Sequence, residues 1–130
     1  MNKKNETGKI KAVPLNPDQM PLPSSAAGFL NRGMAFYARR KYDQAQTDLN
    51  QAAQMDPKLV DAFYALGMTL KAKGEKGESE RAFRQVISMV DSGVLENLVS
   101  AHMLRRLALG EINAMTKGDW DLAKEIFHKV

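Results

Sequence analysis

The sequence predicts an all-α fold of three stacked helical hairpins, and three observations support that prediction. Small and apolar residues recur after 34 positions, so that Phe29, Gly33 and Leu49 are followed by Phe63, Gly67 and Phe83. Apolar residues between positions 94 and 115 step by three or four, as in an amphipathic helix. Glycine or proline occurs where the helices are expected to end. Stacked hairpins present an extended surface, so the residues along that surface are the candidates for function.

Residues 1–25 differ in composition from the rest of the chain and are expected to form a flexible arm. Four prolines lie between Pro14 and Pro23, which favours extended backbone. The longest apolar run in this segment is Ala12-Val13, so we expect neither a signal peptide nor a membrane span. In an alternative interpretation the arm docks into the protein's own groove. The apolar side chains available for this are Val13, Leu15, Met20 and Leu22.

The first two repeats, at about residues 26–59 and 60–93, each read as two helices joined by a turn. Glycines near the middle of each first helix allow the two helices of a hairpin to approach closely. In the first repeat, Asp56-Pro57 ends the second helix, because proline lacks a donor N–H and clashes with a continuing helix. In the second repeat, the turn is expected at residues 74–77, and Gly93 ends the hairpin in the left-handed conformation.

The third repeat, at residues 94–130, fits the pattern only when its frame is shifted by ten residues. The shifted core frame runs from residue 104 and places Phe127 at the position of Leu49, but it puts Glu111 at the position of the glycine. The ten extra residues are expected to lengthen the first helix to roughly Val94–Thr116. A break into two helices near residues 100–103 is the alternative.

The spacing inside each copy carries a family resemblance. The first copy contains Phe29, Arg32-Gly33, Phe36, Ala45, Leu49 and Pro57, and the second contains Phe63, Leu66-Gly67, Leu70, Ser79 and Phe83. This arrangement resembles the tetratricopeptide repeat, in which an aromatic residue, Leu-Gly and Tyr precede Ala, Phe and Pro. Arg32, Ser79 and Asp91 depart from the residues usual at their positions. The resemblance implies that residues 26–130 form a right-handed α-α superhelix of three tetratricopeptide-like hairpins, the third with a lengthened first helix.

In the family that the chain resembles, the first helix of each hairpin lines a concave groove. The matching positions here combine an apolar, methionine-rich centre with a polar fringe. The groove candidates are Leu30, Asn31, Met34, Tyr37, Asp61, Tyr64, Met68, Lys71, Arg105, Ile112 and Met115. Adaptable methionine side chains suit an extended or helical segment of a protein partner, so we predict a non-enzymatic interaction scaffold or adaptor. The alternative is that several of these side chains pack between adjacent helices.

One specialisation of the resembled family is not expected here. Its chaperone-binding members hold an acidic C-terminal tail with a clamp of lysine, asparagine and arginine side chains. The matching positions in this chain hold Leu30, Met34, Ala65, Arg105 and Leu109. Of these residues only Arg105 is cationic, and the two positions at which the clamp has asparagine hold other residues. The sequence therefore argues against recognition of a terminal carboxylate by that clamp.

Charge and composition give little support to other classes of function. The net charge of +4 and the run Arg39-Arg40-Lys41 could contact phosphate, but cations at a helix end also complement its dipole, so we expect no nucleic-acid partner. His102 and His128 have no nearby metal ligands or nucleophile at a recognisable spacing, so we expect no catalysis, metal, cofactor or small-molecule substrate. The absence of cysteine fits a reducing compartment, and we expect a cytoplasmic protein with no membrane partner.

A rival prediction gives the protein a structural or assembly role. The last hairpin of a repeat array exposes the face that a further repeat would cover, which favours a homodimer through the C-terminal hairpin or docking of that hairpin onto a partner. The residues expected on that surface are Trp120, Leu122, Ile126, Phe127 and Val130. The groove would then be idle or filled by the protein's own arm. Alternatively, Trp120 and Phe127 fold entirely into their own hairpin. The identity of the partner and the biological process do not follow from the sequence.

Overall fold

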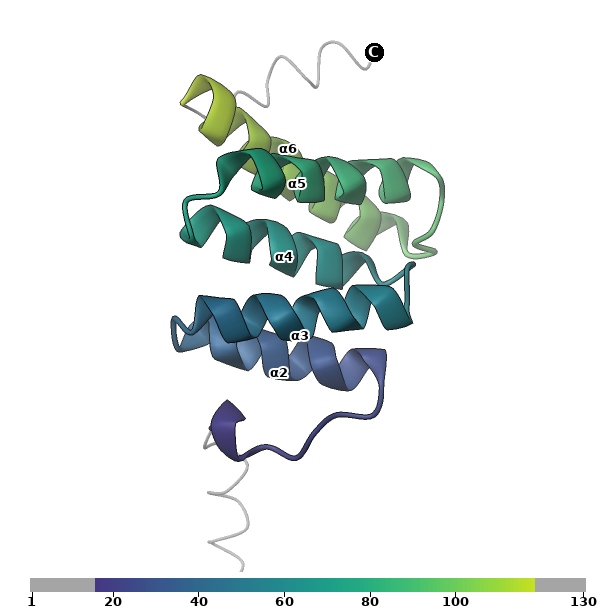
Figure 1. Cartoon of the computed structure of the whole chain (residues 1–130). Helices are drawn as coiled ribbons and strands as arrows, with labels where there is room; N and C mark the ends of the chain where they lie inside the picture. Colours follow the sequence, from purple (N-terminus) through teal and green to yellow (C-terminus); the bar gives the residue numbers. More distant parts are fainter. Residues whose placement is uncertain (1–15, 119–130) are drawn as a thin grey trace, which may run out of the picture.

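The computed structural model describes residues 16–118, and this part of the chain is helical (Figure 1). Its elements, in order, are the 3-10 helix η1 (Pro17–Gln19) and the α-helices α2 (Ala26–Ala38), α3 (Tyr42–Met55), α4 (Val60–Ala72), α5 (Lys76–Asp91) and α6 (Leu98–Lys117). Helices α2 and α3 form one hairpin and α4 and α5 form the next, stacked on the first. The all-α hairpin fold predicted from the sequence is therefore confirmed.

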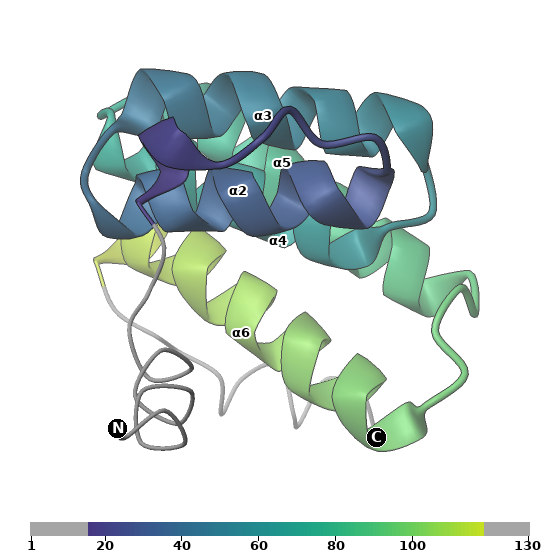
Figure 2. The ribbon, with the colours of Figure 1, turned by 90° about the horizontal axis from the view of Figure 1, so that it is seen from below.

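Helix α6 is the lengthened helix that the shifted third repeat predicts. It has 20 residues, whereas α2 and α4 have 13 each, and it runs without a break through residues 100–103. It begins at Leu98 rather than near Val94, because the Asn97 side chain accepts a hydrogen bond from the Ser100 N–H at 3.0 Å and caps the helix. Figure 2 shows α6 crossing obliquely beneath the two stacked hairpins. No helix within residues 16–118, α6 included, is long and apolar enough to cross a membrane.

A left-handed residue follows each first helix at the same point of the repeat. Arg40 has φ 62°, Gly74 has φ 83° and Gly118 has φ 85°. Arg40 and Gly74 are 34 positions apart, and Gly74 and Gly118 are 44 apart, which is the spacing that the ten-residue shift requires. Gly93 is also left-handed, with φ 83°, and ends the second hairpin as expected.

The core has two parts, one centred on the α2–α3 hairpin and one on the α4–α5 hairpin. The first cluster consists of Leu30, Phe36, Ala45, Leu49, Ala52, Ala62 and Leu66. The second consists of Val60, Phe83, Val86, Met89, Ala108 and Ile112. Each cluster also contains residues from the helix that follows its hairpin. The apolar face of each hairpin is therefore buried only when that next helix packs against it.

Residues 16–25 lie against the first hairpin. Pro17 of η1 is fully buried, η1 contacts α2, and Lys41 forms an ion pair with Asp18. Leu22 is 76% exposed, so its side chain has little contact with the protein. Met20 is half-buried, and Val13 and Leu15, the other two apolar residues of the proposed docking arm, lie outside the described residues.

Candidate protein-binding surface

Most of the residues that the sequence places in a groove are accessible on α2, α4 and α6. Nine of them, called the inner surface below, are Asn31, Met34, Tyr37, Asp61, Tyr64, Met68, Lys71, Arg105 and Met115. The other two candidates, Leu30 and Ile112, are only 8% and 3% exposed and belong to the two core clusters. These two side chains therefore support the surface from below rather than face a partner.

Tyr64 anchors the inner surface on the core of the second hairpin. Its ring packs edge-on against Phe83 with a centroid separation of 5.4 Å, which fixes the tyrosine on the core of the second hairpin. Burial raises the pKa of the Tyr64 hydroxyl above its ordinary value of 10.0, and the nearby Glu111 carboxylate and Tyr37 hydroxyl raise it further. Tyr64 also packs against the second core cluster, which includes Ala108 and Ile112 of α6.

An ion pair crosses from α4 to α6 beside Tyr64. The Lys71 Nζ donates to Glu111 Oε1 at 2.5 Å, with the lysine side chain 42% exposed and the glutamate 8% exposed. Lys71 was predicted from the sequence, whereas Glu111 was noted only because it stands where the repeat has glycine. The sequence signal available for Glu111 was a carboxylate at a position expected to be buried, which calls for a partner. That partner is 40 residues away along the chain.

Methionine gives the inner surface its accessible apolar area. Met34 on α2 is 50% exposed, while Met68 and Met115 are half-buried and pack against the second core cluster. Tyr37 is also half-buried, and the centroid of its ring lies 5.6 Å from the centroid of the Tyr42 ring. The surface therefore combines one prominent side chain with flatter apolar neighbours that the core holds in place.

Polar residues lie at the ends and edges of this apolar area. Asn31 and Asp61 are exposed, and within residues 16–118 their side chains form no hydrogen bond or ion pair. Arg105 is differently placed, because its Nε donates to Asp91 Oδ1 at 2.9 Å and this ion pair ties α6 to α5. Lys71 and Arg105 of the inner surface are thus engaged in ion pairs, whereas Asn31 and Asp61 present their polar side chains to solvent.

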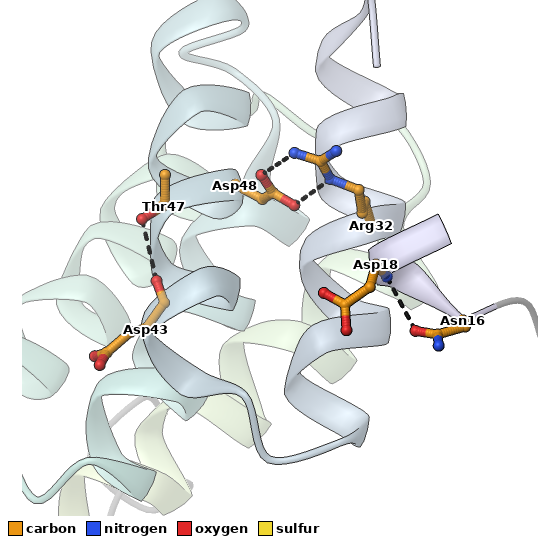
Figure 3. A network of polar contacts seen from close by, with 6 residues as sticks. All are labelled: Asn16, Asp18, Arg32, Asp43, Thr47 and Asp48. Carbon is orange, nitrogen blue, oxygen red and sulfur yellow. Dashed lines mark hydrogen bonds and ion pairs between the residues drawn. The ribbon is translucent and has the colours of Figure 1, made fainter. Parts of the chain in front are cut away.

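A buried ion pair fixes α2, the first helix of the inner surface, to α3. The Arg32 Nε and Nη2 donate to the two Asp48 carboxylate oxygens at 2.7 and 2.9 Å (Figure 3). The guanidinium also lies 5.8 Å from the ring centroids of Phe29 and Phe36. This bidentate arrangement sets the angle and register of α2, and thereby the direction in which Met34 and Tyr37 are presented.

Two family models match the part of the chain that contains the complete hairpins. The model described as TPR repeat matches residues 23–74, and the model described as Tetratricopeptide repeat matches residues 60–89. Together they cover just over half of the 130 residues. The chain belongs to the tetratricopeptide repeat family.

Two curated members of the tetratricopeptide repeat family are similar to this chain. Small glutamine-rich tetratricopeptide repeat-containing protein 2 of Saccharomyces cerevisiae is 29% identical over 75 residues, which are 58% of this chain and 22% of that protein. The protein of the same name from Mycosarcoma maydis is 33% identical over 79 residues, which are 61% of this chain and 21% of that protein. The chain thus spans about a fifth of the length of these relatives. No solved structure matches it significantly.

The positions that match the carboxylate clamp of chaperone-binding family members are occupied differently here. Leu30 is buried in the first core cluster, and Arg105 is paired with Asp91. Met34 is accessible but carries no charge.

Other candidate surfaces lie elsewhere on the chain. A shallow pocket on α5 is lined by Arg84, Ile87, Ser88, Asp91 and Ser92, and it shares no residue with the inner surface. The residues proposed for a C-terminal oligomer surface, from Trp120 to Val130, lie outside the described residues. A dimer through the C-terminal hairpin therefore stays a prediction from the sequence.

Proposed function

We propose that this protein is a non-enzymatic scaffold that binds an extended or helical apolar segment of a partner protein on its inner surface. The observation that carries the proposal is the half-exposed Met34 next to a tyrosine and methionine surface that the core holds in place. Membership of the tetratricopeptide repeat family favours a protein partner, because such repeats serve as interaction scaffolds.

The energetics of this binding follow from the exposure of each group. Met34 gains most from contact with a partner because half of its side chain is still in water. Tyr64 and Met68 are already partly buried, so they contribute shape and a polar hydroxyl more than newly buried area. Asn31 and Asp61 are available to hydrogen-bond the polar backbone or side chains of the bound segment. An apolar segment with polar groups at its edges is therefore the ligand that fits best.

The proposal includes the cytoplasm as the compartment and a protein as the ligand. A chain without cysteine suits a reducing environment. The cations of the inner surface are engaged in ion pairs, Lys71 with Glu111 and Arg105 with Asp91. A surface whose cations are neutralised in this way favours apolar contacts over phosphate binding.

A random peptide library displayed on phage, selected against the full chain, tests this proposal. The best peptide is then titrated against the Met34→Lys variant and against Met55→Lys as a matched control. Met55 lies on α3 and is 45% exposed, close to the 50% of Met34, so both changes cost the free protein little. We expect Met34→Lys to weaken binding about tenfold or more, because it puts a charge against an apolar contact, and Met55→Lys to leave binding unchanged.

The opposite pattern contradicts the proposal. If Met34→Lys binds every selected peptide as tightly as the original chain, while circular dichroism shows both variants equally helical, the inner surface is not the binding site. Charged substitutions of Tyr64 or Met68 are less decisive, because both residues also pack against the second core cluster and their replacement perturbs stability as well as binding.

A further inference from the structure

The ion pair between Lys71 and Glu111 is open to a ligand, unlike the pair between Arg32 and Asp48. The Lys71 side chain is 42% exposed, and the Glu111 side chain that it contacts is 8% exposed. The corresponding values for Arg32 and Asp48 are only 18% and 4%. A partner on the inner surface therefore meets the Lys71 ammonium first, with a buried carboxylate next to it.

Both residues of this pair stand next to methionines of the inner surface. Lys71 follows Met68 by three positions on α4, and Met115 follows Glu111 by four positions on α6, which are the spacings of neighbours on a helix face. Met68 and Met115 both pack against the second core cluster. The pair is therefore a charged spot within the apolar area on which a partner segment lies.

Carboxylates outnumber cations on the inner surface once the ion-pair partners are counted with it. The cations are Lys71 and Arg105, and the carboxylates are Asp61 of the surface itself, Glu111 and Asp91. These five groups carry one net negative charge, whereas the whole chain carries +4. Without the charge of Glu111 the five positions would be neutral in sum, so this residue decides the sign of the charge that a ligand meets.

We propose that Glu111 is a specificity-determining residue, which makes the inner surface select apolar segments without acidic side chains. This role rests on the proposed binding of a protein segment. The Lys71 ammonium has three N–H donors and Glu111 accepts from one of them, so a neutral acceptor of the segment can take another. A carboxylate of the segment gains little there, because its attraction to Lys71 is offset by repulsion from the Glu111 carboxylate.

A purely structural role for the ion pair leads to a different expectation. Glutamine at position 111 keeps an oxygen that accepts from Lys71, and so keeps the link between α4 and α6, but it removes the negative charge. If the pair only joins the two helices, Glu111→Gln leaves the charge preference of the inner surface unchanged. If Glu111 neutralises Lys71, the same variant frees a cation, and acidic segments then bind more tightly.

Glutamate and glutamine scans of a peptide selected on phage against the full chain provide the test, with Kd measured by isothermal titration calorimetry. With the original chain, no glutamate peptide should bind more tightly than its glutamine counterpart. With Glu111→Gln, glutamate should bind about tenfold more tightly than glutamine at one position or more of the peptide. The double variant Lys71→Gln/Glu111→Gln carries no charge at either residue and should lose this preference.

Glu80→Gln is the matched control. It changes the net charge by the same amount and removes the partner of Arg84, which lines the α5 pocket and not the inner surface. Its glutamate and glutamine peptides should bind alike. Lys71→Gln is the reverse experiment, because it leaves the charge of Glu111 without a cation. A lysine peptide should then bind about tenfold more tightly than its glutamine counterpart.

The role of Glu111 is overturned if the original chain already prefers glutamate, or if Glu111→Gln prefers it at no position or no more than Glu80→Gln does. If circular dichroism shows that Glu111→Gln has lost helicity, Lys71→Gln decides, and the absence of any gain from lysine overturns the role. Failure of the proposed function looks different, because Met34→Lys then leaves the binding of every selected peptide unchanged. Weaker binding to Met34→Lys without a glutamate preference in Glu111→Gln contradicts the role of Glu111 alone.

Discussion

In the α2–α3 hairpin Gly33 lies against Leu49, whereas in the α4–α5 hairpin the equivalent Gly67 lies against Phe83. A Cβ atom at Gly33 would be 2.9 Å from the Leu49 Cγ, and one at Gly67 would be 2.7 Å from the Phe83 ring. Both hairpins therefore use the absence of a side chain on one helix to admit a large apolar side chain from the other. The shape of the contact is kept although the residue that fills it changes.

The same two hairpins differ more at the position beside the glycine. In the first hairpin Arg32 forms a bidentate ion pair with Asp48, whose side chain is 4% exposed. The equivalent residues of the second hairpin, 34 positions later, are Leu66 and Ala82, which pack in the first core cluster. One repeat thus joins its helices with a charged pair where the other uses apolar contact. The repeat therefore fixes the geometry of the hairpin more strictly than the chemistry of its contacts.

Removal of the large side chain beside the glycine should have the greatest effect, and should affect the second hairpin more. Phe83→Ala is expected to cost about 4 kcal/mol of unfolding free energy, because a fully buried phenyl ring leaves a cavity. Leu49→Ala removes a smaller side chain, also fully buried, and should cost about 3 kcal/mol. Urea unfolding followed by circular dichroism measures both. Equal losses would show that the two contacts are energetically alike despite their different residues.

Replacing Arg32 and Asp48 by the leucine and alanine found at the equivalent positions of the second hairpin tests how much the ion pair contributes to stability. Arg32→Leu alone leaves the Asp48 carboxylate buried without its partner and should cost about 3 kcal/mol. Asp48→Ala alone should cost about 2 kcal/mol, since the guanidinium left behind can still reach water. The double variant, which carries the leucine and alanine of the second hairpin, should be within about 1 kcal/mol of the original chain. A double variant as unstable as the sum of the single ones would mean that the two residues act independently.

The loss of stability on replacing each glycine by alanine should depend on how closely the facing side chain approaches it. Gly67→Ala is expected to cost about 2 kcal/mol, because its new methyl group meets the enclosed ring of Phe83. Gly33→Ala should cost less, since its new methyl group would lie 2.9 Å from the Leu49 Cγ and 3.0 Å from its Cδ2, a milder overlap than that with the Phe83 ring atoms at 2.7 to 2.8 Å. Thermal unfolding of the two variants ranks them directly. A reversed order would show that the backbone around Gly67 yields more easily than that around Gly33.

The smallest expected effect concerns a hydrogen bond present in only one hairpin. Ser79 Oγ donates to the Gly67 carbonyl at 2.7 Å, while Ala45 occupies the equivalent position of the first hairpin. Ser79→Ala should cost about 1 kcal/mol, because a buried hydrogen bond is lost but the methyl group still fits. A loss within experimental error, measured by urea unfolding, would show that both hairpins tolerate the same small residue there.

The fold was predictable because spacing determines it. Glycines at 33 and 67 and the helix-ending residues fixed the first two hairpins, and the stepped apolar residues of 94–115 predicted a long α6. The start of α6 at Leu98 was missed, since apolar periodicity extends past the Asn97 cap. The sequence also did not reveal that Pro17 would be buried, because proline-rich composition favours extended backbone without indicating whether it packs.

The candidate surface was predictable only in part. The family pattern identified the helices that carry it, but not which positions turn towards the core, and Leu30 and Ile112 proved to be core residues. Adjacent positions on a helix differ by about 100° in direction, so a small rotation of one helix changes which side chains are exposed. The partners of Arg32 and Lys71 lie 16 and 40 residues away, and side-chain pairs at such distances follow from the packing of the helices rather than from local sequence.

Amide chemical-shift mapping of the full chain with a selected peptide shows whether the inner surface binds a protein segment. We expect the largest shifts at Asn31, Met34, Asp61 and Lys71, on α2 and α4. Amides around Met55 on α3 should remain unshifted. Shifts confined to the α5 pocket around Arg84 and Ser88, with the inner surface unchanged, would contradict binding on the inner surface.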